Sequence, residues 1–186
     1  QDMTRLDAEL SRLRTVDWEL ETNEVTEVWG AHHKFTQHED GTIAYLSIDI
    51  RDWENTDTGQ VATLVGDRIV ELSPDGEETE IFTVWDSVEV VEHGLWNIPY
   101  YQDMVDWTHA NSISYNEADD TYLISLGNLD TLLEVQRSTG EVLDVINDQT
   151  YSFVGQSTLF NYQHDAKWTA EGTLLMTTTK GGTFGV

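Results

Sequence analysis

Cysteine is absent from this chain of 186 residues, and basic residues are scarce. Without thiols the chain has no disulfides, thiolate metal sites or cysteine nucleophiles. Nine Lys and Arg face 35 Asp and Glu, which gives a formal net charge of −26. Proteins that bind nucleic acid need clustered cations to displace the counterions of phosphate. The charge therefore excludes a nucleic-acid partner, and it disfavours binding to an anionic membrane surface.

Long apolar runs are missing as well. No run approaches the roughly 18 residues of a membrane-spanning helix, so we expect no membrane insertion. No basic stretch followed by an apolar one opens the sequence, so no signal peptide is visible, although a processed secreted chain would look the same. Hydrophobic residues still make up 39% of the chain, with seven Trp, which is too apolar for a disordered protein. The acidic excess indicates a solubilising surface and fits a saline environment.

A hairpin-like unit recurs along the chain. Residues 67–77 (DRIVELSPDGE) and 130–141 (DTLLEVQRSTGE) both read as Asp, an apolar strand, a polar turn and Gly-Glu. Residues 18–27 (WELETNEVTE) form a degraded copy without the glycine. Apolar strands followed by Pro-Asp-Gly or Ser-Thr-Gly predict β-hairpins.

A second repeated unit begins with a histidine. His33 and His164 are each followed by Gly at eight residues, Thr at nine and then an apolar strand, whereas after His109 the matching Thr comes at twelve. The two kinds of unit alternate, as in a β-propeller, whose blades are four-stranded antiparallel meanders of about 40–50 residues. We therefore predict an all-β chain with about three to four blades. Because closed propellers have about four to eight blades, we expect a partial propeller, or one completed by a second copy or another chain.

Three segments depart from this rhythm. Apolar residues fall at helical spacing in residues 1–15, which predicts either a short amphipathic helix or a strand of an incomplete blade. Residues 16–186 would then form the blades. Residues 49–59 (DIRDWENTDTG) are polar and end in Gly, which predicts a loop or decorated turn. Residues 85–107 form a long aromatic connection of the kind that lines a binding mouth.

Three of the six histidines share one repeat position, whereas His38 and His93 read as structural or exposed. Propeller symmetry would carry His33, His109 and His164 to one ring at the mouth of the channel. Converging imidazoles fit a metal site, nucleophilic or acid–base catalysis, or a polar cap of the channel, and the pattern leaves all three open. No HExxH or HxH pair indicates a metal, and no Walker A, GxSxG or GxGxxG motif is present, so we expect neither a metal nor a cofactor.

Residues 106–130 (DWTHANSISYNEADDTYLISLGNLD) resemble the arylsulfotransferase family of β-propeller enzymes, which carries an Asp-Trp-x-His-x-Asn-Ser motif followed by an acidic turn and a strand. Residues 31–35 (AHHKF) and 162–166 (YQHDA) resemble the family's His-His-Asp and Gln-His-Asp-Ala stretches. The resemblance covers about residues 16–180, and the family's C-terminal blades are missing. It implies sulfuryl transfer from a phenolic sulfate ester to a phenol, in the periplasm or outside the cell.

The resemblance also implies roles for residues. His164 matches the family's nucleophile, which would carry the sulfuryl group as sulfohistidine. His109 and Asn111, two residues apart on an extended segment, would donate to the sulfuryl oxygens. His33, preferred to His32 because it keeps the spacing seen after His164, would do the same or assist proton transfer from the phenol. The remaining residues placed beside the substrate are His32, Trp107, Gly127 and Asn128.

Two positions depart from the family pattern. Gly127 stands where the family has Arg, and Lys34 where it often has Asp. A guanidinium binds oxyanions bidentately, and loss of one preorganised donor costs about 3 kcal/mol, so we expect reduced activity. Two alternatives stay open: a catalytically silent propeller that serves as a binding or assembly module, and a metal-assisted hydrolase or lyase that uses the histidines.

Overall fold

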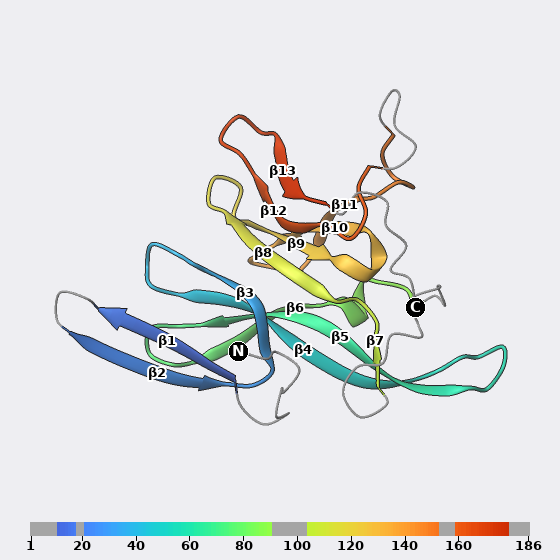
Figure 1. Ribbon diagram of the computed structural model, residues 1–186, viewed down its shortest axis with the longest axis horizontal. Helices are drawn as coiled ribbons and strands as arrows, with labels where there is room; N and C mark the ends of the chain where they lie inside the picture. Colours follow the sequence, from blue (N-terminus) through green and yellow to red (C-terminus); the bar gives the residue numbers. More distant parts are fainter. Residues whose placement is uncertain (1–10, 18–20, 91–103, 153–158, 179–186) are drawn as a thin grey trace.

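The computed structural model describes residues 11–17, 21–90, 104–152 and 159–178, and every regular element in these ranges is a strand or a short 3₁₀ turn (Figure 1). The predicted all-β class is confirmed. A hairpin comes first, formed by β1 (Ser11–Asp17) and β2 (Thr22–Val28). A five-stranded sheet follows, built from β3 (Ala31–Gln37), β4 (Ile43–Glu54), β5 (Val61–Leu72), β6 (Glu78–Thr83) and β7 (Val105–Asp106).

The second half of the chain repeats this plan. A four-stranded meander contains β8 (Ala110–Asn116), β9 (Thr121–Leu126), β10 (Thr131–Gln136) and β11 (Val142–Ile146). A last hairpin contains β12 (His164–Trp168) and β13 (Leu174–Thr177). The 3₁₀ turns η1 (Val84–Asp86) and η3 (Gly127–Leu129) follow β6 and β9. In the order β3-β4-β5-β6 and β8-β9-β10-β11 each strand pairs with its neighbour in sequence, which is the strand order of a propeller blade.

Both predicted hairpins with Gly-Glu turns are present. In the turn between β5 and β6, Gly76 has a φ of 86° and its N–H donates to the Ser73 carbonyl. In the turn between β10 and β11, Gly140 has a φ of 70° and its N–H donates to the Gln136 carbonyl. Positive φ is open to glycine without a Cβ clash, so these two glycines allow the chain to reverse at the positions that the repeat marks.

The sheets stack because their strands bury both faces. Successive side chains of a strand point to opposite faces. On β9, Tyr122, Ile124 and Leu126 pack in the core shared with the β3–β6 sheet, whereas Leu123 packs in a second core towards β12. Figure 1 shows the resulting order: the β1–β2 hairpin, the β3–β6 sheet, the β8–β11 meander and the β12–β13 hairpin. This stacking sets β3, β8 and β12 side by side, since β8 contacts both of the others.

A buried polar network joins the β3–β6 sheet to the β8–β11 meander near their hairpin turns. The Tyr122 hydroxyl lies 2.5 Å from Glu71 Oε1 and 2.7 Å from His38 Nε2, and the Arg137 guanidinium donates to both oxygens of Glu71. The ring of His38 also stacks on Tyr115 at 4.0 Å between centroids. His38 therefore has the structural role that its isolated position in the sequence predicted.

Some segment predictions need correction. Residues 49–54 are not a loop but the second half of β4, because each of them pairs with a residue of β5, from Asp49 with Gly66 to Glu54 with Val61. Residues 11–15 belong to β1, so this part of the N-terminal segment takes the strand alternative, while residues 1–10 lie outside the described residues. Much of the 85–107 connection, with His93, also lies outside them.

Candidate active site

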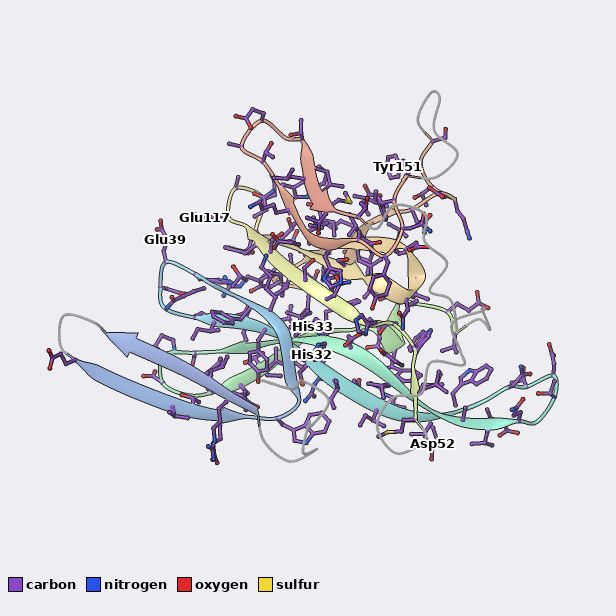
Figure 2. All side chains as sticks on the ribbon, in the orientation of Figure 1. His32, His33, Glu39, Asp52, Glu117 and Tyr151 are labelled. Atoms are coloured by element: carbon purple, nitrogen blue, oxygen red, sulfur yellow. The ribbon has the colours of Figure 1, made fainter. Side chains whose placement is uncertain are left out.

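Three histidines from three different sheets meet at one end of the adjacent strands β3, β8 and β12. The ring centroids of His33 and His109 are 4.9 Å apart, and those of His33 and His164 are 6.4 Å apart. His33 lies in β3, His109 immediately precedes β8, and His164 begins β12. Figure 2 shows His32 and His33 near the middle of the molecule, whereas Glu39 and Glu117 lie at the tips of the β3–β4 and β8–β9 hairpins. The structure therefore brings together the three imidazoles that share a repeat position.

Irregular backbone aims these side chains. The register of strand pairing shifts once in each of three strands: in β3 between His32 and Phe35, in β8 between Ala110 and Ser112, and in β12 between His164 and Lys167. At or beside these shifts, His33, His109 and Asp165 have φ values of 52°, 50° and 54°. Positive φ is uncommon outside glycine, and bulges that re-aim a side chain are frequent next to active sites. The sequence predicts an extended segment from 109 to 111, but His109 has a positive φ and the register of β8 shifts between Ala110 and Ser112.

His109 is held by a carboxylate three residues before it. Its Nδ1 lies 2.6 Å from Asp106 Oδ2, and the two side chains are 21% and 10% exposed. Burial disfavours the charged imidazole, but the hydrogen bond to Asp106 and the negative charges of Asp106 and Asp67 prevail and raise the pKa of His109. With Nδ1 bound to the carboxylate, Nε2 is the nitrogen left for a ligand. Asp106 therefore favours the positively charged form of His109.

A second carboxylate lies behind His33. Asp67 is buried and accepts hydrogen bonds from Thr108 Oγ1 at 2.5 Å and from the Ala110 N–H at 2.7 Å. Its other oxygen lies 3.0 Å from His32 Nε2, a bent contact rather than a linear hydrogen bond. Burial opposes its ionisation, but the contacts with His32, Thr108 and Ala110 keep the pKa of Asp67 below its ordinary value. Asp67 is thus a fixed negative charge at the base of the cluster.

His33 and His164 favour the neutral form. Partial burial and then the neighbouring His32 and His109 lower the pKa of His33 to about 4. Burial and then the charge of His109 lower the pKa of His164, which Asp165 only partly opposes. A neutral imidazole retains the lone pair that a nucleophile or a general base needs. The cluster therefore combines two neutral imidazoles with one that favours the cation.

A sequence profile described as Arylsulfotransferase (ASST) matches residues 16–172. The chain belongs to the arylsulfotransferase family. The resemblance read from the three histidine motifs is confirmed, and membership assigns sulfuryl transfer, with aryl sulfate and phenol as substrates, at the level of the family. Comparisons with curated proteins and with solved structures gave no match.

Little space surrounds Gly127, the position where the sequence resemblance leads us to expect the family's arginine. A Cβ on Gly127 would lie 2.6 Å from Asn111 Nδ2, 3.2 Å from the His109 carbonyl oxygen and 3.4 Å from His109 Cδ2. Position 127 therefore points at the two residues expected to bind sulfuryl oxygens, but Asn111 occupies the space that a larger side chain needs. Asn111 Nδ2 donates to the Gln163 carbonyl at 2.8 Å, while its Oδ1 is buried without a hydrogen-bond partner.

Other residues expected beside the substrate have supporting positions. Trp107 is fully buried and packs on Trp85, with 4.6 Å between ring centroids, while its contact with the substrate stays a prediction. The amide of Asn128 donates to the Asp106 carbonyl at 2.8 Å, which helps to fix the residue that holds His109. The side chain of His32 is only 7% exposed and lies behind His33. These three residues support the cluster from within the protein.

Three residues of the cluster were not predicted from the sequence, namely Asp67, Asp106 and Tyr162. The ring of Tyr162 lies between two histidines, 5.5 Å from His109 and 5.6 Å from His164 between centroids. Asp106 could have been found, because it opens the Asp-Trp-x-His motif. Asp67 is 35 residues from its partner His32 in a chain of 35 acidic residues, so no local pattern marks it.

A groove of about 800 Å³ follows the same three strands towards their hairpin ends. Lys34 and Lys167, two of the three lysines of the chain, line it together with Phe35 and Trp168. Lys34 also forms an ion pair with Asp165, which links β3 to β12. In the ranges that the structure describes, no group of three or more His, Asp or Glu side chains has the arrangement of a metal site, and no helix could span a membrane.

Proposed function

We propose that this protein transfers a sulfuryl group from a phenolic sulfate ester to a phenol through a sulfohistidine at His164. The observation that carries the proposal is the convergence of His33, His109 and His164 from three strands. We also propose that the β3–β6 and β8–β11 sheets are propeller blades with β3, β8 and β12 as inner strands, in a partial propeller or in one that a second copy or another chain completes.

The donor half of the reaction starts at His164. Its neutral imidazole attacks sulfur, the bond from sulfur to the aryl oxygen breaks, and a phenolate leaves as the nitrogen–sulfur bond forms. Negative charge spreads over the sulfuryl oxygens in the transition state, where hydrogen-bond donors stabilise it most. His109 supplies such a donor, and its bond to Asp106 favours the positively charged form.

The acceptor half reverses these steps with a second phenol. The acceptor oxygen attacks sulfur, the nitrogen–sulfur bond breaks, and the phenol proton passes to a base. His33 has the position and the neutral state for that base, since its ring contacts His109 and faces His164. Gly127 removes one charge donor from the site, which supports turnover below that of a site with the arginine.

The experiment uses p-nitrophenyl sulfate as donor and phenol as acceptor, with and without a chelator. We expect phenol-dependent release of nitrophenolate that survives chelation, and a mass increase of one SO₃ group on His164 when the acceptor is left out. His164→Ala should abolish both signals. Loss of turnover on chelation would favour the metal-assisted hydrolase or lyase.

A second candidate is a catalytically silent propeller that binds or assembles with other molecules. The closed space at Gly127 favours it, because no guanidinium can enter there without displacing Asn111. A folded wild-type protein that shows neither turnover nor sulfohistidine would support this candidate and contradict the transferase.

A further inference from the structure

The structure assigns a proton relay to Asp67, His32 and His33, which removes the proton of the acceptor phenol in the second half of the reaction. This inference rests on the proposed function and deepens it. Three contacts carry it: His32 Nε2 lies 3.0 Å from Asp67 Oδ1, His32 Nδ1 lies 2.8 Å from His33 Nδ1, and the ring of His33 faces His109 and His164.

The contacts fix which nitrogen carries each proton. Asp67 is buried and ionised, so the nitrogen that faces it, His32 Nε2, carries a hydrogen. Neutral His32 then has its lone pair on Nδ1. Because that lone pair lies 2.8 Å from His33 Nδ1, the latter must carry the hydrogen between the two rings. His33 Nε2 is left with a free lone pair.

This arrangement takes one proton from the acceptor phenol by two linked proton shifts, one onto His33 and one from His33 to His32. As the acceptor oxygen bonds to sulfur, its O–H bond breaks and an N–H bond forms at His33 Nε2. The hydrogen on His33 Nδ1 shifts to His32 Nδ1, so the positive charge moves to His32, where the Asp67 carboxylate neutralises it. The relay is reset when the proton on His32 Nδ1 returns to His33 Nδ1 and the proton on His33 Nε2 is released to solvent.

Electrostatics explain why His33 passes the proton on. The groups around His33 are His32, His109, His164 and Asp67; burial and the three imidazoles lower its pKa to about 4, against the opposing effect of Asp67. His33 alone would therefore be a weak base at neutral pH. Charge on His32 lies directly beside the buried carboxylate, which Thr108 and Ala110 hold in place. Asp67 and His32 are positioning residues, and His33 is the group that meets the acceptor.

The test compares two acceptors in the wild type and in His32→Gln. Phenol keeps its proton at neutral pH, whereas a polyfluorinated phenol is already ionised and needs no base. General-base assistance contributes about 10²- to 10⁴-fold. We expect His32→Gln to slow transfer to phenol by about 10²-fold and to change transfer to the ionised phenol, and the nitrophenolate burst without acceptor, by no more than a few fold.

His38→Gln is the matched control, because His38 is a buried histidine outside the cluster and Gln can keep its bond to Tyr122. It should leave the ratio of the two acceptor rates unchanged. Nitrogen-15 NMR of the imidazoles supplies a readout that needs no turnover: His32 should carry its hydrogen on Nε2 and His33 on Nδ1.

Separate results overturn the relay and the proposed function. An equal loss with both acceptors, or the opposite tautomers, would overturn the relay while sulfohistidine formation still supported the transferase. A wild type without sulfohistidine and without turnover would overturn both.

Discussion

Replacing Asp106 by Asn tests how the site obtains a positive charge without an arginine. The substitution keeps the size of the side chain but removes the negative charge that lies 2.6 Å from His109 Nδ1. The pKa of His109 should fall, because the hydrogen bond and the charge of Asp106 are what raise it against burial. The proposed donor to the sulfuryl oxygens would then favour the neutral imidazole more than it does in the wild type.

The size of the effect follows from the geometry. A hydrogen bond to a charged group contributes about 1.5–3 kcal/mol, and the upper half of this range suits a pair whose side chains are only 21% and 10% exposed. Since 1.4 kcal/mol corresponds to a factor of about ten, the rate of sulfuryl transfer should fall by about 40- to 150-fold. The high-pH limb of the rate profile should also move to lower pH, because His109 loses its proton earlier in the variant.

The assay measures nitrophenolate release with phenol across pH, together with the NMR titration of His109. Asp52→Asn is the control: this aspartate accepts from Thr63 Oγ1 at 2.7 Å near the far end of the β4–β5 ribbon (Figure 2), and its loss should leave the profile unchanged. If Asp106→Asn lowered the pKa of His109 in the NMR titration yet kept the wild-type rate and pH profile, a charged His109 would have no part in catalysis.

Two further substitutions test the packing and the charge of the cluster. Gly127→Arg should not restore activity, and it should lower the free energy of unfolding by about 1–3 kcal/mol, because its Cβ would lie 2.6 Å from Asn111 Nδ2. A rise in kcat without loss of stability would contradict this prediction. His33→Gln should flatten the acid dependence of the free energy of unfolding. The unfolded chain takes up a proton at His33 below pH 6.5 and the folded chain only near pH 4, so the wild type loses stability as the pH falls through this window. The loss is at most about 1.4 kcal/mol per pH unit, and it is smaller because solvent screens the exposed ring. Equal slopes of the free energy of unfolding against pH for wild type and variant, measured by urea titration, would refute this prediction.

The fold could be predicted from the sequence where its signal is local. The turns at Gly76 and Gly140 mark hairpins because glycine relieves a clash that any other residue would meet at these φ values. The half of β4 beyond Asp49 was not predicted as a strand, because its residues are mostly polar and none of them is fully buried, so no apolar pattern marks it. Strand pairing, rather than composition, decides the structure there.

The candidate site, like the fold, has one part that the sequence predicts and another that it does not. His33, His109 and His164 could be found because each repeats at one place in a unit that the sequence displays. The arrangement of Asn111 against Gly127 depends on a bulge between Ala110 and Ser112, and no residue type announces that bulge. The sequence therefore predicts which histidines come together, but not which ring nitrogen of each one is available to a ligand.

The carboxylates of Asp67 and Asp106 bear on how the site functions with glycine, rather than arginine, at position 127. An arginine stays charged at every pH that a protein survives, so a site built on it has a constant positive charge. Here Asp106 raises the pKa of His109, so a positive charge on this imidazole depends on pH and on that contact. Because the formal net charge of the chain is −26, we expect binding of an anionic donor to weaken as His109 loses its proton. A family site that has exchanged arginine for glycine is therefore a pH-dependent site, and its activity has to be measured on the acidic side of the His109 titration before it is judged absent.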